Sequence, residues 1–313
     1  MVAVPVETTS VIGVDLGGTK ILAGVVDRES RVLRRVEHPT PVSSQAELLS
    51  RLDAVVEELL SEDGVAALGF GIPSTVDQVR GRAVFSTNLP LADLDFRDRM
   101  QERFGLPVGI DNDANAATIA EWVVGAGRGT RHMVMLTLGT GIGGGLILDG
   151  RPYRGSVGAA AELGHIVIQH DGPPCQGVCT GRGHLEVLAS GTAAGKVARE
   201  LLGPEANAYD LVRKAQDGDV AAVEALAEIG SKLGSGIGSL VNIFNPELVV
   251  IGGGFAAAGD LVLDPAREVM RREALEPARD LVRIVHAELG PEAGLVGAAL
   301  VAFEALGSGD SRG

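Results

Sequence analysis

Two segments of one pattern, 122 residues apart, constrain the fold of this 313-residue chain more than any other feature. Residues 11–27 read VIGVDLGGTKILAGVVD, and residues 133–149 read MVMLTLGTGIGGGLILD. Each has an apolar β-type run, a break at glycines, a second apolar run and a final aspartate. Laid over one another without a gap, they pair Leu16 with Leu138 and Asp27 with Asp149. This predicts one β-hairpin unit used twice, and therefore two related α/β domains.

Charge and composition exclude several classes of protein. The chain has 27 basic and 41 acidic residues, a formal charge of −14, which argues against a long basic groove for DNA or RNA. No apolar run approaches the roughly 20 residues that span a bilayer, and the N-terminal sequence MVAVPVETTS does not read as a signal peptide. With 45% hydrophobic residues, we expect a globular cytoplasmic protein of two domains, with neither a nucleic-acid nor a membrane partner.

The glycines of the second hairpin spell G-x-G-x-x-G, but they do not indicate a dinucleotide fold. That fingerprint needs a helix directly after the glycines, whereas the chain continues as GGLILDGRPY, a strand closed by an Asp-Gly turn. The segment GTAAGKV at residues 191–197 is one residue too short for a Walker A loop, and we interpret it as a helix start.

Glycine turns of this kind can bind phosphate groups. Backbone N–H groups can point one way, and missing side chains let phosphate oxygens approach the main chain. Tight turns alone would explain either hairpin, but polar residues at both turns favour a phosphate and its magnesium. A third cluster, Gly252 to Gly254, follows an apolar strand and is typical of a seat for a nucleotide base or ribose.

Acid and base groups gather in two stretches of the chain. In PVGIDNDANAATIAEW, a short strand at residues 108–110 precedes an alanine-rich helix, so Asp111, Asn112 and Asp113 lie at the helix N-terminus. A helix N-cap needs only one of these three residues, so capping alone does not account for all of them. After the second hairpin, one glycine-rich stretch concentrates further candidates for ligand or metal contacts. They are Glu162, His165, Cys175, Cys179, His184 and Glu186.

The motifs DLGGTK, IPSTVD, DNDANAA, LGTGIGGG, AAELGH, CTGRGHLE and VVIGGG occur in this order over residues 11 to about 300. This combination resembles the ROK family (repressor, open reading frame, kinase) of the sugar-kinase and actin superfamily. The resemblance implies a two-lobed α/β, ribonuclease H-like fold with a ligand cleft between duplicated domains. It places a small lobe at residues 1–116, completed by a C-terminal helix in residues 295–313, and a large lobe at residues 117–294. It also implies a homodimer or homotetramer.

The family resemblance further implies an ATP-dependent glucokinase that uses Mg²⁺. Asp113 then matches the catalytic base for the sugar 6-hydroxyl, and Asp15 matches the residue that helps position magnesium. The matching sugar contacts are Asn88, Asn112, Asp113, Glu162, His165 and Glu186. The matching nucleotide and phosphate residues are Asp15, Gly17, Gly18, Thr19, Lys20, Gly139, Thr140, Gly141, Gly253 and Gly254.

The only two cysteines of the chain, Cys175 and Cys179, lie near histidines, a pattern that favours a metal over a disulfide. Thiolate and imidazole are the ligands that Zn²⁺ prefers, so we predict a structural zinc site of His165, Cys175, Cys179 and His184. The family pattern is C-x-C-G-x-x-G-C-x-E, and this chain departs from it. Gly177 stands where the first cysteine aligns, Cys175 comes two residues earlier, and His184 replaces the last cysteine. The alternative is two free thiols in a loop.

Three alternatives to an ATP-dependent glucokinase stay open. Polyphosphate resembles the tail of ATP, so a polyphosphate-dependent glucokinase is one. A few pocket residues could select fructose, N-acetylmannosamine or another hexose. A sugar-responsive regulator is the third. Repressors of the family carry an N-terminal helix-turn-helix module, whereas in this chain the first hairpin already begins at Val11.

Overall fold

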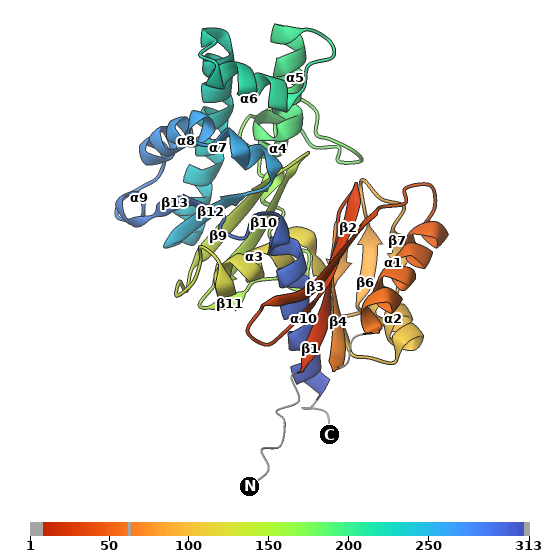
Figure 1. Ribbon diagram of the computed structural model, residues 1–313. Coiled ribbons are helices and arrows are strands. Elements are labelled where there is room, and N and C mark those ends of the chain that lie inside the picture. Colours follow the sequence, from red (N-terminus) through yellow and green to blue (C-terminus); the bar gives the residue numbers. More distant parts are fainter. Residues whose placement is uncertain (1–8, 62–63, 310–313) are drawn as a thin grey trace. The chain divides into compact units, whose positions relative to one another are not determined.

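The computed structural model describes residues 9–61 and 64–309, and its contacts divide the chain into two compact units (Figure 1). Unit 1 comprises residues 1–124, 154–160 and 291–313, and unit 2 comprises residues 125–153 and 161–290. The boundary that we expected after residue 116 falls after Val124, because the helix that follows residue 112 packs on the last helix of unit 1. Residues 154–160, expected in the large lobe, also belong to unit 1.

Unit 1 is built on a five-stranded sheet of order β3-β2-β1-β4-β8, with a small sheet of order β5-β6-β7 beside it. β1 pairs antiparallel with β2 and parallel with β4, and β4 pairs parallel with β8. The strands are β1 (Ser10–Leu16), β2 (Lys20–Val26), β3 (Val32–Pro39), β4 (Val65–Ile72), β5 (Thr75–Asp77), β6 (Arg82–Phe85), β7 (Ala92–Leu94) and β8 (Val108–Asn112). The helices are α1 (Gln45–Leu60), α2 (Phe96–Phe104), α3 (Asp113–Val124) and α10 (Ala293–Gly309).

Unit 2 repeats this topology with the sheet order β11-β10-β9-β12-β13. β9 pairs antiparallel with β10 and parallel with β12, and β12 pairs parallel with β13. The strands are β9 (Met133–Leu138), β10 (Ile142–Leu148), β11 (Arg151–Pro152), β12 (Leu248–Gly252) and β13 (Arg283–His286). The helices are α4 (Leu185–Ala189), α5 (Gly191–Leu202), α6 (Ala208–Gln216), α7 (Val220–Phe244), α8 (Asp260–Glu273) and α9 (Ala278–Leu281), with short 3₁₀ turns η1 (Leu163–His165), η2 (Gly254–Ala258) and η3 (Gly290–Glu292).

The duplicated hairpins predicted from the sequence are confirmed, but the gapless superposition of their second strands is wrong by one residue. Leu16 pairs with Ile21 in the first hairpin, and Leu138 pairs with Ile142 in the second. The second turn is therefore one residue shorter. Accordingly Asp27 is buried and binds Arg31, whereas the Asp149 side chain is 78% exposed.

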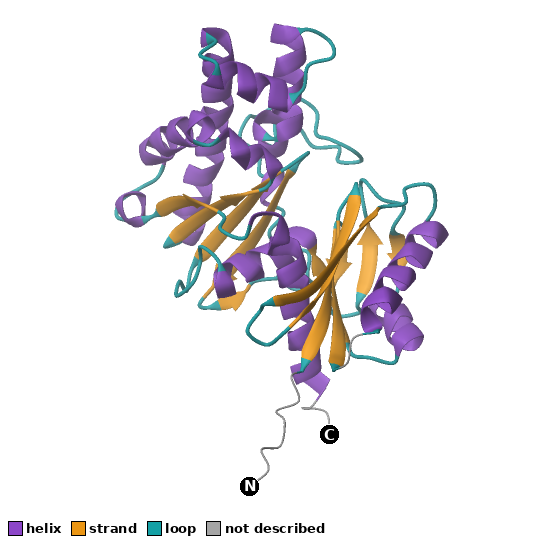
Figure 2. Ribbon diagram, in the orientation of Figure 1, coloured by secondary structure: helices purple, strands orange, loops and turns teal. Residues whose placement is uncertain are grey.

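Three glycines paired across unit 1, Gly13, Gly69 and Gly109, form what we call the glycine row. A Cβ added at these positions would lie 1.9–2.4 Å from backbone oxygens of α10, those of Leu295, Ala298 and Val301. Because these oxygens follow one face of the helix, the absence of side chains lets α10 lie directly on the sheet. Alternate strand residues face the opposite side, where they pack with α1 and α2 (Figure 2).

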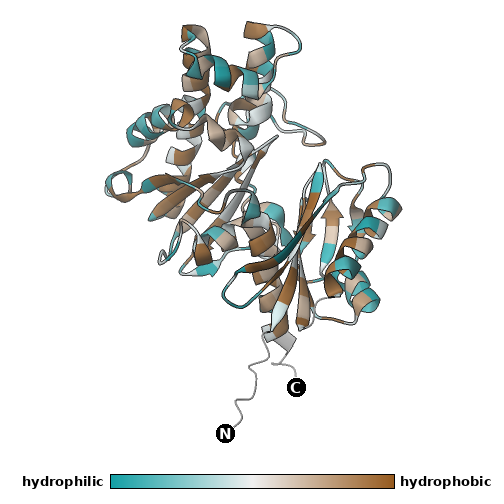
Figure 3. Cartoon of the chain, in the orientation of Figure 1, coloured by the Kyte–Doolittle hydropathy of each residue, from teal (hydrophilic) through white to brown (hydrophobic). Residues whose placement is uncertain are grey.

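Each unit has its own apolar core. In unit 2, buried residues of α7 and α8 cluster with those of β9 and β12. Figure 3 shows apolar residues concentrated on the strands of both sheets and hydrophilic residues on α1 and α2. No helix within residues 9–61 and 64–309 has the length and hydropathy needed to cross a membrane.

Candidate functional site

The turn from β8 into α3 carries three consecutive polar residues with different roles, Asp111, Asn112 and Asp113. The side-chain oxygen Oδ1 of Asn112 accepts hydrogen bonds from the backbone N–H groups of Ala114 and Asn115, at 2.9 and 3.2 Å, so Asn112 caps the helix. Asp111 is fully buried and is paired with Arg154, with 2.6 Å between Oδ2 and Nε. Asp113 is neither the cap nor part of that ion pair, so its carboxylate can serve in ligand binding or proton transfer.

Asp113 lies close to Asp15, which stands near the end of β1. Burial raises the pKa of Asp113, against backbone hydrogen bonds that lower it. Burial, followed by the charge of Asp113, raises the pKa of Asp15 to about 7, against the opposing charge of Lys20. Gly294 leaves room for the carboxylate, because a Cβ there would lie 2.3 Å from Oδ2 of Asp15. The two carboxylates repel one another, and a divalent cation would relieve that repulsion.

The first glycine turn is anchored at its base and exposed at its tip. Thr40 donates its hydroxyl to the carbonyl of Gly17 and its N–H to the carbonyl of Thr19, at 2.8 and 3.0 Å. Gly18, Thr19 and Lys20 are exposed. Lys20 pairs with Glu37 at 2.9 Å, an ion pair with both side chains about half exposed. An exposed pair of this kind is weak, so the Lys20 ammonium can leave Glu37 and bind a phosphate instead.

The second glycine turn is braced by two neighbouring elements of unit 2. Gly191, at the start of α5, donates its N–H to the carbonyl of Gly139 at 2.8 Å. Glu186 accepts the N–H of Ile142 at 3.2 Å, and a Cβ at Gly141 would lie 2.2 Å from that carboxylate. Gly253 has a φ of +87°, and a Cβ there would lie 2.4 Å from the carbonyl oxygen of Leu138. Glycine is thus required at position 253, whereas a side chain at position 141 would displace the Glu186 carboxylate.

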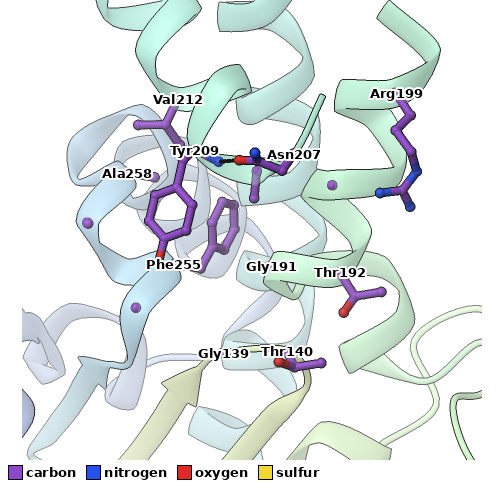
Figure 4. Close-up of a pocket in the computed structure, with 14 residues that line it drawn as sticks. Gly139, Thr140, Gly191, Thr192, Arg199, Asn207, Tyr209, Val212, Phe255 and Ala258 are labelled. Atoms are coloured by element: carbon purple, nitrogen blue, oxygen red, sulfur yellow. Dashed lines mark hydrogen bonds between the residues drawn. The ribbon is translucent and has the colours of Figure 1, made fainter. Parts of the chain in front are cut away.

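A pocket of about 490 Å³ in unit 2 opens beside this turn (Figure 4). The N-terminal turn of α5, capped by Ser190, provides Gly191 and Thr192 next to Gly139 and Thr140. A helix N-terminus favours anions through its dipole and its N–H groups. Figure 4 shows the Tyr209 and Phe255 rings on the side of the pocket opposite Thr192 and Arg199. The lining residues are Gly139, Thr140, Gly191, Thr192, Gly195, Arg199, Asn207, Ala208, Tyr209, Val212, Gly254, Phe255, Ala257 and Ala258.

The four predicted metal ligands come together in unit 2. One potential ligand atom from each of His165, Cys175, Cys179 and His184 lies within 4.8 Å of all the others. Cys175 Sγ lies 3.5 Å from Nδ1 of His165 and 3.1 Å from Nδ1 of His184, and Cys179 Sγ lies 3.8 Å from the latter. Burial, followed by a hydrogen bond with Cys179, raises the pKa of the Cys175 thiol to about 12.

A family model described as "ROK family" matches residues 11–305, nearly the whole chain. The chain belongs to the ROK family. It is 36% identical to a glucokinase of Streptomyces coelicolor, with 94% of this chain and 97% of that one covered. It is also 36% identical to a glucokinase of Thermotoga maritima, with coverages of 95% and 98%.

A solved structure gives the same assignment at the level of the fold. The ROK family glucokinase from Streptomyces griseus in complex with glucose and AMPPNP matches with a TM-score of 0.83 and 36% identity. The match covers 94% of this chain and 99% of that one. The expected mixed α/β, two-lobed ROK sugar-kinase fold is therefore confirmed.

The sugar contacts implied by the ROK resemblance divide between the units. Asn112 and Asp113 belong to unit 1, as does Asn88, which is exposed in the turn between β6 and β7. Glu162, His165 and Glu186 belong to unit 2, and the last two lie 4.0 Å apart, from Nε2 to Oε1.

Much of the pocket lining lies outside the residues predicted from the sequence. Gly139, Thr140 and Gly254 were predicted and line it, but Arg199, Asn207, Tyr209 and Phe255 were not identified. The segment 191–197 begins a helix, as expected, and its first turn is also a pocket wall. The position of segment 191–197 directly after the cysteine-bearing stretch is the sequence signal that could have indicated its place in the pocket wall.

Proposed function

We propose that this ROK protein is a glucokinase that transfers the γ-phosphate of ATP to the 6-hydroxyl of glucose. The observation that carries the proposal is the likeness to the S. griseus ROK glucokinase, whose structure contains glucose and AMPPNP, over 94% of the chain. Two curated glucokinases at 36% identity support the same activity.

The proposed base is Asp113. A carboxylate whose pKa is raised by burial binds a proton more strongly than an ordinary aspartate, which suits removal of the hydroxyl proton during transfer. Because the transition state of phosphoryl transfer is loose, alignment of hydroxyl and phosphate matters more than base strength. Magnesium would neutralise charge on the phosphates, and Asp15, whose carboxylate is repelled by Asp113, fits a role in positioning it.

We assign the nucleotide to the pocket of unit 2. The turn at Gly139 and Thr140, with the N-terminus of α5, offers backbone N–H groups and a helix dipole to phosphates. The Tyr209 and Phe255 rings offer an apolar surface to the base. In unit 1, Gly17, Gly18, Thr19 and Lys20 are the proposed phosphate residues of the first turn.

Sugar recognition is assigned to Asn88, Asn112, Asp113, Glu162, His165 and Glu186. Carboxylates, amides and an imidazole engage hydroxyls directionally, and a sugar lacking one hydroxyl would leave a buried polar group unpaired. Selection among hexoses therefore rests on these side chains.

We further propose that His165, Cys175, Cys179 and His184 bind one Zn²⁺. Four of the six separations between their ligand atoms are 3.1–3.8 Å, close to the edges of a tetrahedron with metal–ligand bonds of about 2.0–2.3 Å, and all six are within 4.8 Å. A Cβ at Gly181 would lie 2.4 Å from the His184 ring, so the glycine makes room for this ligand. The metal would be structural, because four protein ligands leave no open position.

This arrangement reconciles the two roles assigned to His165. Its Nδ1 faces Cys175, whereas its Nε2 faces Glu186. One ring nitrogen can therefore bind the metal while the other is directed toward the sugar-binding residues, an orientation that a metal would fix. For the whole molecule, we propose a cytoplasmic homodimer or homotetramer, as the family resemblance implies.

A coupled assay of glucose, fructose and N-acetylmannosamine, each with ATP or polyphosphate, tests the proposed activity. We expect the highest kcat/KM with glucose and ATP. Polyphosphate as the better donor, or another hexose as the better acceptor, would reassign the substrate. Phosphorylation of no hexose would overturn the kinase proposal.

A further inference from the structure

Arg154 lies outside every motif of the proposed active site, yet it binds Asp111, two positions before the proposed base. It belongs to the segment 154–160, which the contacts place in unit 1. Its Nε lies 2.6 Å from Oδ2 of Asp111, and its Nη2 lies 2.9 Å from Oε2 of Glu304 in α10. The Asp111 side chain is 0% exposed, that of Arg154 is 24% exposed and that of Glu304 is 47% exposed. The pair with Asp111 is thus the desolvated one.

Asp111 uses both carboxylate oxygens. While Oδ2 binds the guanidinium, Oδ1 accepts the backbone N–H of Asn112 at 2.8 Å and the side-chain amide of Asn115 at 3.2 Å. These two residues flank Asp113, one before it and one in the first turn of α3. A shift of the Asp111 carboxylate would therefore be passed directly to the backbone that carries the proposed base.

The segment around Arg154 is itself fixed to the same strand. The carbonyl of Val157 accepts the N–H of Gln78 at 2.9 Å, and the Gln78 side chain donates to the carbonyl of Ile110 in β8 at 2.7 Å. Gly158 has a φ of +99°, and a Cβ there would lie 2.4 Å from Cγ of Gln78. The guanidinium is thus presented to Asp111 by a segment that is tied to β8 at a second point.

We propose that Arg154 is a positioning residue for phosphoryl transfer, which acts through Asp111 to fix the Asn112–Asp113 turn. This role rests on the proposed function of Asp113. Without the guanidinium, the buried Asp111 carboxylate loses its countercharge only two residues from Asp113. The carboxylate must then move or bind a proton, and either change releases the hydrogen bonds that hold the turn.

The test compares Arg154→Met, Glu304→Gln and the double variant Asp111→Asn/Arg154→Met. We expect Arg154→Met to lower kcat about tenfold to a hundredfold, the cost of a small misplacement, with a smaller change in KM for glucose and ATP. Glu304→Gln removes the exposed ion pair with Arg154 while the pair with Asp111 stays, and it should keep the kcat of the wild type. The double variant should recover most of the lost kcat, because asparagine can still accept both donors on Oδ1 and carries no buried charge.

Equal loss of kcat in Arg154→Met and the double variant would overturn the proposal, as would a wild-type kcat in a folded Arg154→Met protein. Should Arg154→Met fail to fold, Arg154→Gln replaces it; glutamine also removes the countercharge of Asp111, so kcat should still fall, and an unchanged kcat would contradict the role. Hydrogen–deuterium exchange of residues 111–118 gives a readout independent of activity. Exchange should accelerate in Arg154→Met and not in Glu304→Gln, even if the wild type phosphorylates no sugar and the proposed function fails.

Discussion

Glu186 accepts a hydrogen bond from the backbone N–H of Ile142, with 3.2 Å between Oε2 and N. Its other carboxylate oxygen lies 3.5 Å from Sγ of Cys175 and 4.0 Å from Nε2 of His165. One side chain thus joins the second glycine turn to the cysteine–histidine cluster. Within unit 2, loosening of the cluster is therefore expected to affect both the proposed sugar contacts and the proposed phosphate turn.

Asp113→Asn should lower kcat by about a hundredfold or more, as loss of a general base commonly does. Asparagine can still accept the N–H of Ala114, so the start of α3 is preserved while proton removal is lost. Steady-state kinetics with glucose and ATP measure this, and Asp98→Asn, an exposed acidic position in the first turn of α2, is the matched control. Near-normal turnover would leave Asp113 with a structural role only.

Tyr209→Ala should raise KM for ATP about three- to tenfold, the range expected for loss of one aromatic contact, and leave KM for glucose unchanged. Tyr209 lines the pocket that we assign to the nucleotide. Tyr153→Ala, at a half-exposed position outside that lining, serves as the control. If both variants show the same KM for ATP, the base does not contact Tyr209.

Asp15→Asn should stabilise the protein at pH 8 in the absence of magnesium. The folded-state pKa of about 7 lies above the ordinary value of 3.8, so the folded protein binds the proton more tightly and loses stability as pH rises through 7. We expect Tm to rise by at least about 2 °C at pH 8, the shift for roughly 1 kcal/mol in a protein of this size.

The Tm difference between Asp15→Asn and the wild type should shrink at pH 5, where the wild-type carboxyl is protonated. Thermal unfolding at the two pH values measures both effects. A difference of the same size at pH 5 and pH 8 would show that the charge of Asp15 is not its cause.

Cys179→Ser should reduce bound zinc from about one equivalent per chain to well under one, because a hydroxyl is a poor ligand for Zn²⁺. Metal analysis of protein purified without added zinc measures this, and activity after chelation is followed in parallel. His170→Ala, whose side chain is 94% exposed, is the histidine control. Wild-type protein without zinc, and fully active after chelation, would contradict the metal site.

Gly69→Ala should destabilise the protein by about 1–3 kcal/mol or more, the usual cost of overpacking. The added Cβ would lie 1.9 Å from the carbonyl oxygen of Ala298, so α10 must move off the sheet. Urea unfolding measures the change. Gly307→Ala in the same helix meets nothing within 4 Å and should be neutral or slightly stabilising. Equal stability of the two variants would show that α10 does not depend on the glycine row.

Local signals in the sequence predict most of what lies within a single element or turn. The two glycine hairpins, the start of α3 at Asp113 and the strand ending at Gly252 follow from alternating apolar residues, helix-start residues and glycines. The register of the second hairpin cannot be predicted from these signals, because its shorter turn removes one residue without changing the pattern of either strand.

Features that join distant parts of the chain escape such reasoning. Tyr209 and Phe255 meet in one pocket from α6 and η2, and Asp111 binds Arg154 across 43 positions. Each of these residues has an ordinary local reading as a helix-surface, loop or capping residue. Only the packing of the sheets and helices reveals the partner.

The position of α10 on the glycine row has a consequence for the order in which the chain matures during translation. The ribosome completes all of unit 2 before it makes residues 293–309, so one face of the first sheet stays uncovered until then. Unit 2 can therefore acquire its native structure ahead of the unit whose synthesis began first. The nascent sheet of β1, β4 and β8 is the region that we expect a chaperone to shield during that interval.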